Sequence, residues 1–157
     1  MTTLAIEDVQ TYPRPPALEP VAQTLTIYLG SQQIACTTRG YRVLETHHAP
    51  TYYFPPEDVI AELLPVRGES FCEWKGMARY FDVVGSERIA RHAAWCYERP
   101  TGAFQPLAGY LAFYAASMDR CLVGDTEVVP QPGDFYGGWV TSNLRGQIKG
   151  APGTRHW

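Results

Sequence analysis

Two short segments of the chain combine aromatic rings, a thiol and charged groups at spacings that could build a binding site. Residues 72–76 read Cys-Glu-Trp-Lys-Gly, and residues 94–100 read Ala-Trp-Cys-Tyr-Glu-Arg-Pro. Side chains alternate between the two faces of a β-strand, so the thiol of the first segment would share a face with its tryptophan, and Trp95 would share one with Tyr97. Two such strands would wall one aromatic pocket, but no complete catalytic motif accompanies them.

The sequence predicts that this pocket binds a small molecule. Indole and phenol rings suit flat or cationic ligands, and a cation over such a ring gains about 0.5–2 kcal/mol. Arg42 and Lys75 would set the charge of the ligand. Gly76 allows a bend in the chain that would aim Lys75 into the pocket mouth. The alternative is that the rings form only the core of an aromatic-rich sheet. The predicted ligand-binding residues are Trp74, Trp95, Tyr97, Tyr52 and Arg42.

Cys72 and Lys75 are the two candidates for catalytic chemistry in the pocket. A nearby cation favours the thiolate form of a cysteine, which is the nucleophilic form. Positions 72 and 75 face opposite sides of a regular strand, and no histidine is close in sequence to act as a base. A core role for Cys72 therefore competes with a catalytic one, and an enzyme that uses Cys72 or Lys75 is the alternative function.

The sequence predicts no metal site and no cofactor. Structural zinc is commonly held by Cys-x-x-Cys pairs, and this chain contains none. His47 and His48 are adjacent, so on a strand at most one of them could bind a metal ion. The isolated cysteines Cys36, Cys72, Cys96 and Cys121 could converge in space, but a small buried hydrophobe is the usual role of a free cysteine.

The carboxylates also lack the spacing that a two-metal phosphoryl-transfer site needs, because no Asp-x-Asp pair occurs. Asp125 and Glu127 fit a polar hairpin turn, and Asp58 with Glu62 fits the solvated face of a short helix. Residues 146–154 are rich in glycine, as phosphate-binding loops are. In such a loop the lysine follows the glycine, however, whereas Lys149 precedes Gly150, and Pro152 lacks a backbone N–H donor. A turn-rich arm is therefore expected there in place of a phosphate-binding loop.

Charge and composition exclude several classes of protein. The 157 residues carry a formal net charge of −3 and scattered basic residues, so there is no field to hold a phosphate backbone. No apolar run approaches the roughly 20 residues of a membrane span, and the first residues lack the pattern of a secretion signal. We expect a cytoplasmic protein with reduced cysteines that binds neither nucleic acid nor membrane.

The elements that must position these residues are predicted to be antiparallel strands of one domain, residues 23–129. Residues 1–22 are rich in proline and are predicted to form an extended arm. In residues 130–157 glycines separate aromatic residues, which predicts an arm packed on the domain or on a neighbouring subunit. That arm would join a homo-oligomer or dock on a partner, so a protein-interaction module is the third possible function.

Alternation of apolar and polar residues predicts the individual strands, and turns are predicted at Gly30-Ser31, Gly85-Ser86 and Gly124-Asp125. A short helix is predicted from Pro55 to Leu64, because proline and acidic residues favour a helix start and Pro65 would end it. Residues 111–118 fit either a strand or a helix. The main predicted strands are 25–29, 33–37, 41–46, 51–54, 70–75, 78–84, 89–97, 109–114 and 121–129.

Several of these runs, in order and spacing, resemble a bacterial family known as domain of unknown function 427. The resemblance implies a mainly β fold, a β-tent in which two antiparallel sheets meet at an angle, with one or two short helices, similar to methionine sulfoxide reductase B. It implies no agreed activity, although the family has also been filed under a nucleotidyltransferase-like label. Residues 135–141 and 149–154 resemble the C-terminal extension of one branch. The runs that carry the main resemblance are 42–46, 50–59, 72–76, 95–100 and 109–114.

Overall fold

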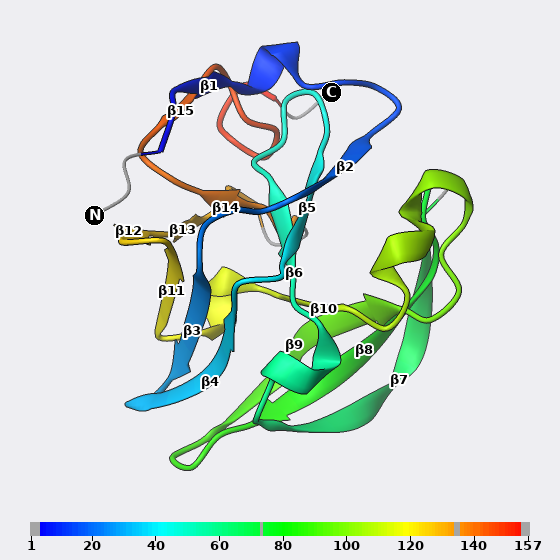
Figure 1. Ribbon diagram of the computed structural model, residues 1–157, viewed down its shortest axis with the longest axis vertical. Helices are drawn as coiled ribbons and strands as arrows, with labels where there is room; N and C mark the ends of the chain where they lie inside the picture. Colours follow the sequence, from blue (N-terminus) through cyan, green and yellow to red (C-terminus); the bar gives the residue numbers. More distant parts are fainter. Residues whose placement is uncertain (1–3, 73, 134–135, 155–157) are drawn as a thin grey trace.

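The computed structural model describes residues 4–72, 74–133 and 136–154, which form a mainly β protein (Figure 1). Two four-stranded sheets and one three-stranded sheet are antiparallel and carry most of the strands. The helical segments in this described part are short 3-10 helices. The predicted mainly β class is therefore confirmed.

The first sheet contains the hairpin that the sequence predicts around residue 30. Leu25, Ile27 and Leu29 alternate with more polar residues and are buried, and Gly30 turns the chain with a φ of 64°. The turn predicted at Gly124 connects the last two strands of this sheet. In the order β12-β11-β3-β4, the strands are β3 (Leu25–Leu29), β4 (Gln32–Thr37), β11 (Arg120–Val123) and β12 (Thr126–Glu127).

The second sheet shows that the predicted helix at residues 55–64 is wrong. The chain makes one 3-10 turn, η2 (Pro56–Asp58), and then enters a long edge strand that contains Pro65. An edge strand tolerates proline because its outer backbone groups need no partner, and pairing along β8 outweighs a weak helical pattern. In the order β10-β9-β8-β7, the strands are β7 (Glu62–Cys72), β8 (Gly76–Val84), β9 (Ile89–Tyr97) and β10 (Leu111–Phe113).

Two further predictions for this sheet are resolved by its boundaries. The strand predicted over residues 70–75 stops at Cys72, because the chain turns there to enter β8. The strand predicted over residues 109–114 is observed as β10, and the alternative of a continuous helix to residue 118 is wrong, because only η4 (Ala115–Ser117) is helical there. The predicted hairpin between residues 84 and 89 is confirmed.

The third sheet joins the N-terminal arm to the domain. β2 lies within residues 1–22 and pairs with β5, and Phe54 forms two backbone hydrogen bonds of 2.8 Å with Leu111, which links this sheet to β10. The predicted arm thus supplies an edge strand, apart from residues 1–3, which lie outside the described residues. In the order β2-β5-β6, the strands are β2 (Ala17–Pro20), β5 (Tyr41–Leu44) and β6 (Thr51–Tyr53).

The C-terminal segment packs on its own domain. Trp139 is fully buried, and its indole N–H donates a hydrogen bond of 3.1 Å to the carbonyl oxygen of Phe113. β15 lies beside β1 in a parallel pair (Figure 1), whereas residues 134–135 and 155–157 of the predicted arm lie outside the described residues. The remaining elements are β1 (Glu7–Asp8), η1 (Val9–Thr11), η3 (Gly102–Leu107), β13 (Val129–Pro130), β14 (Trp139–Val140) and β15 (Leu144–Arg145).

β9 separates two apolar clusters. Ala94 and Cys96 face the larger cluster, which also holds Trp139, whereas Trp95 and Tyr97 face a smaller, aromatic cluster. This alternation follows from the two-residue period of a strand. Trp95 and Tyr97 therefore share a face, as the sequence predicts, and that face bears the candidate site.

Candidate functional site

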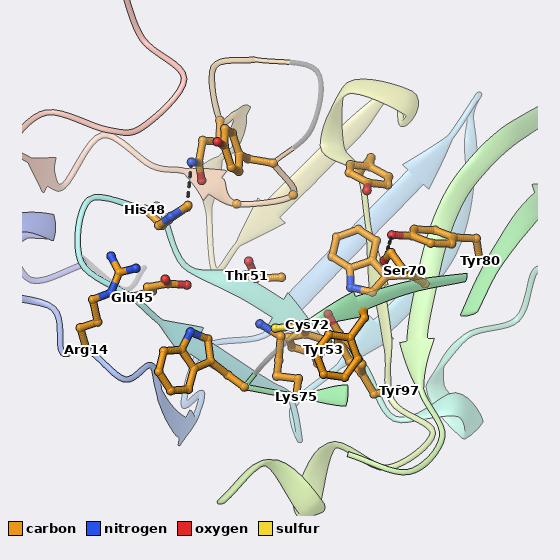
Figure 2. Close-up of a pocket in the computed structure, with 18 residues that line it drawn as sticks. Arg14, Glu45, His48, Thr51, Tyr53, Ser70, Cys72, Lys75, Tyr80 and Tyr97 are labelled. Atoms are coloured by element: carbon orange, nitrogen blue, oxygen red, sulfur yellow. Dashed lines mark hydrogen bonds between the residues drawn. The ribbon is translucent and has the colours of Figure 1, made fainter. Parts of the chain in front are cut away.

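A pocket of about 350 Å³ opens on the face of β9 that carries Trp95 and Tyr97 (Figure 2). The second sheet and the turn after β7 form its aromatic side, the β5–β6 connection forms a polar side, and the C-terminal segment covers part of it. The lining residues are Arg14, Glu45, His48, Thr51, Tyr53, Ser70, Phe71, Cys72, Trp74, Lys75, Tyr80, Trp95, Tyr97, Tyr114, Gln131, Tyr136, Gly137 and Gly138.

The structure brings five residues singled out in the sequence to this one pocket: Cys72, Trp74, Lys75, Trp95 and Tyr97. The strand argument for the first segment is wrong, because Trp74 and Lys75 lie in the turn between β7 and β8. Both side chains line the pocket because the hairpin folds back at this turn. The next residue, Gly76, has a φ of 105°, which glycine adopts without strain.

The aromatic wall is nearly closed to solvent. Tyr53, Trp95 and Tyr97 are 1%, 7% and 6% exposed, and the rings of Trp95 and Tyr114 lie 4.5 Å apart. Burial raises the pKa values of Tyr53 and Tyr97 above their ordinary range and raises the pKa of Tyr114 to about 12. These hydroxyls therefore stay protonated at neutral pH and can donate hydrogen bonds to a ligand.

Lys75 brings a positive charge to this aromatic wall. Its Nζ lies 5.7 Å from the ring centroid of Tyr97 and 5.8 Å from that of Phe104. Figure 2 shows Lys75 among Cys72, Tyr53 and Tyr97. Lys75 forms no ion pair with any residue in the described part of the chain, so aromatic faces hold its ammonium group in place of carboxylates.

Arg14, Glu45 and His48 group at the polar end of the pocket (Figure 2). Burial lowers the pKa of His48, the positive charges of Lys149, Lys75 and Arg14 lower it further, and Glu45 opposes them. His48 is therefore neutral at neutral pH. Gln131 Nε2 lies 3.2 Å from His48 Nδ1, and because an amide nitrogen can only donate, Nδ1 accepts this hydrogen bond.

The C-terminal segment closes one side of the pocket. A Cβ atom added at Gly137 would overlap the indole of Trp95, and one at Gly138 would overlap the side chain of Gln131. Gln131 also accepts a hydrogen bond of 3.2 Å from the backbone N–H of Ala49. The two glycines thus permit a backbone approach that a larger residue would prevent.

Arg42 and Tyr52 lie outside this pocket. Arg42 donates two hydrogen bonds to Glu7, of 3.0 and 2.9 Å, and one of 2.6 Å from Nε to Glu19. The ring of Tyr52 packs 5.3 Å from that of Trp139 and is almost fully buried. Both residues border a separate cavity of about 230 Å³ beneath the N-terminal strands.

Within residues 4–72, 74–133 and 136–154, no group of three or more His, Cys, Asp and Glu side chains comes together to hold a metal ion. Asp125 sits in the predicted turn, and Glu127 forms an ion pair of 2.8 Å with Arg120. Asp58 accepts a hydrogen bond of 2.7 Å from Thr37, but Glu62 lies on β7 and not on a helix. Glu127 and Asp58 are therefore held by structural partners.

Sequence reasoning missed several residues that line the pocket. Ser70 and Tyr80 are joined by a hydrogen bond of 2.5 Å between their hydroxyls, and Tyr80 stacks on His92 with centroids 4.2 Å apart. No local signal marks Ser70 or Arg14. The Gly137-Gly138 pair is a usable signal, because two consecutive glycines next to aromatic residues indicate a close backbone approach.

A protein-family model described as a domain of unknown function (DUF427) matches residues 17–124 of the chain. No curated protein matches it. Among the described residues, no helix has the length and apolar character needed to cross a membrane. The pocket residues that fall outside the matched range are Arg14, Gln131, Tyr136, Gly137 and Gly138.

Proposed function

Because the chain belongs to the domain of unknown function 427 family, whose description states no activity, we propose a function from its pocket. The protein binds a flat aromatic small molecule that carries a negative charge. The observation that carries this proposal is the position of Lys75, whose ammonium group lines an aromatic pocket without a carboxylate partner in the described part of the chain.

The aromatic wall accounts for the flat part of the ligand. Offset and edge-to-face contacts between aromatic rings add about 0.5–1.5 kcal/mol beyond the burial of their area. Trp95, Tyr97 and Tyr114 present such rings around one space. The protonated hydroxyl groups of Tyr97 and Tyr114 and the amide of Gln131 add hydrogen-bonding groups for the edge of a ligand.

Lys75 accounts for the charge of the ligand. Aromatic faces alone would equally suit a cationic ligand, but Lys75 already lies over Tyr97 and Phe104. A second cation in that space would be repelled, whereas an acidic group would form a charge-assisted hydrogen bond with the ammonium. The pocket therefore favours an aromatic acid over an aromatic amine.

The test is isothermal titration calorimetry with 2-naphthoate and its neutral analogue 2-naphthamide. A charge-assisted hydrogen bond contributes about 1.5–3 kcal/mol, so 2-naphthoate should bind at least about tenfold more tightly. Lys75→Gln should remove this preference and leave 2-naphthamide binding unchanged. Arg67→Gln is the matched control, because Arg67 is an exposed cation that does not line the pocket.

Equal affinities for 2-naphthoate and 2-naphthamide in the wild-type protein would contradict the assignment of charge. Loss of 2-naphthoate binding in Arg67→Gln as well as in Lys75→Gln would show that general positive charge attracts the acid. Absence of binding for both compounds would contradict the proposal as a whole.

An enzyme that uses Cys72 or Lys75 remains the second candidate. Cys72 lines the same pocket, and the two side chains can both approach a bound molecule there. An interaction module is less favoured, because the C-terminal segment uses its Trp139 in the core of its own domain. We also propose, from the family resemblance, that the antiparallel sheets form a β-tent.

A further inference from the structure

The chain has thirteen basic residues, but only Lys75 and Lys149 are lysines. Both are near the pocket, since each of them lowers the pKa of His48 at its polar end. The ion pairs among the described residues are all made by arginines, such as Arg39 and Arg42. The two lysines thus differ from most of the arginines in two ways: they lie near the pocket, and they form no ion pair with a residue that the structure describes.

Lys149 repeats the arrangement of Lys75. Its Nζ lies 5.7 Å from the ring centroid of Tyr136, and it forms no ion pair with any residue that the structure describes. A cation over a partly exposed ring such as that of Tyr136 gains only a modest attraction. The positive charge of Lys149 is therefore available to an anion.

Lys149 also lines a second cavity, of about 420 Å³, formed with Tyr136 and residues 150–154. Tyr136 lines this cavity and the aromatic pocket as well, so the two spaces adjoin at one ring. A ligand that extended from the aromatic pocket past Tyr136 would enter the cavity that Lys149 lines.

The backbone of Lys149 is fixed at both of its polar groups. Its N–H donates a hydrogen bond of 2.7 Å to the carbonyl oxygen of His47, and its carbonyl oxygen accepts one of 3.0 Å from Gln131 Nε2. Gln131 is the same side chain that bonds to His48 in the pocket. The backbone of Lys149 is therefore tied to the polar end of the pocket, while its ammonium group lies over the ring of Tyr136.

We infer that Lys149 forms a second anion-binding position next to the aromatic pocket, so that the ligand is a flat aromatic molecule with two acidic groups. One acidic group is directed to Lys75 and the other to Lys149. This inference rests on the proposed function and specifies its ligand class. It also assigns the second position to the C-terminal segment, which lies beyond the residues matched by the family model.

The experiment compares 2-naphthoate with two dicarboxylates of different length, naphthalene-2,6-dicarboxylate and biphenyl-4,4′-dicarboxylate, by isothermal titration calorimetry. Two equivalent acidic groups raise the affinity about twofold by symmetry alone, so a real second position must give more. We expect at least one dicarboxylate to bind about tenfold or more tightly than 2-naphthoate. Lys149→Gln should reduce that gain to about the twofold factor and lower the 2-naphthoate affinity by a much smaller factor.

Two further variants complete the design. Lys149→Arg should keep most of the gain, because it keeps the charge, and Arg67→Gln should keep all of it. If 2-naphthoate binds but neither dicarboxylate exceeds the symmetry factor, or if Lys149→Gln keeps the gain, the second position is refuted and the proposed function stands. If none of the three acids binds, the proposed function fails and this inference fails with it.

Discussion

Arg42 and Lys75 are the two cations that the sequence analysis expects to set the charge of a ligand, and the structure gives them opposite surroundings. The side chain of Arg42 is 16% exposed and lies between the carboxylates of Glu7 and Glu19. Lys75 lies in the aromatic pocket with ring faces as its partners. The partners of a half-buried cation therefore decide whether it supports the fold or stays available to a ligand.

The chemistry of the two side chains explains the difference. A guanidinium group is planar and presents several donors, which match the two oxygens of a carboxylate. Arg42 makes this two-point contact with Glu7 and reaches Glu19 with Nε. An ammonium group is a compact charge on a flexible stem, which suits a ring face and an exchangeable anion.

The largest expected effect is on stability. Arg42→Met should lower the free energy of unfolding by about 2–3 kcal/mol, because it leaves two partly buried carboxylates without their cation. Lys75→Met should change it by less than about 1 kcal/mol, because no carboxylate loses a partner. Urea unfolding followed by circular dichroism measures both values.

A matched control is available in Arg39, which also pairs with two carboxylates, Glu57 and Asp58, but has a side chain that is 57% exposed. Exposed ion pairs contribute about 0–1 kcal/mol, so Arg39→Met should cost far less than Arg42→Met. Equal costs for the two substitutions would show that burial of the pair does not distinguish the two arginines.

The second prediction concerns acid. Burial raises the pKa of Glu7, but hydrogen bonds from Arg42 and Tyr12 outweigh it, so the pKa is lower in the folded protein than in the unfolded chain. The stabilisation from Glu7 is therefore present above the unfolded value, about 4.3, and is lost as pH falls through the lower folded value. Stability measured by urea unfolding should decrease in this acid range.

Arg42→Met should show a weaker dependence on pH in the same range, because Glu7 without its cation no longer has a lowered pKa. The difference in stability between the wild type and Arg42→Met should therefore shrink as the solution is acidified. Arg39→Met again serves as the control. If the difference in stability between the wild type and Arg42→Met stays constant with pH, Arg42 does not stabilise the protein through the ionisation of Glu7.

The smallest expected effect is on the reactivity of Cys72. Cys72 lines the pocket and Cys36 is exposed, whereas Cys96 and Cys121 are buried, and burial raises the pKa of Cys121 to about 12. Iodoacetamide should therefore modify Cys36 and Cys72 first. Saturating 2-naphthoate should slow the modification of Cys72 by about tenfold and leave that of Cys36 unchanged.

Peptide mass spectrometry measures each rate separately, and Cys36 provides the internal reference. Equal protection of both cysteines would indicate a general effect of the compound on the protein. Unchanged modification of Cys72, under conditions in which calorimetry shows binding, would place the ligand outside this pocket.

The hairpins were the most predictable part of the fold. Alternation over residues 25–29, glycine turns at positions 30, 85 and 124, and the two-residue period of β9 are local signals, and each corresponds to an observed strand or turn. The helix predicted before Pro65 was wrong because β7 is stabilised by β8, a neighbour that the local pattern does not include.

The residues of the candidate site also divide into those that a local pattern predicts and those that it does not. Period two placed Trp95 and Tyr97 on one face, since that relation depends only on the strand itself. Arg14, Ser70 and Gln131 carry no local signal, because they reach the pocket from three separate parts of the chain.

The sequence by itself determined the strands of the main hairpins and the common face of Trp95 and Tyr97, because backbone geometry and side-chain period act within a few residues. Only the tertiary structure decided that Arg42 meets Glu7, 35 positions away in the chain, and that the backbone of Gly137 covers Trp95. The availability of a charge and the closure of a pocket depend on such distant partners. Burial and charge pairing are properties of the packed chain, and no single segment contains them.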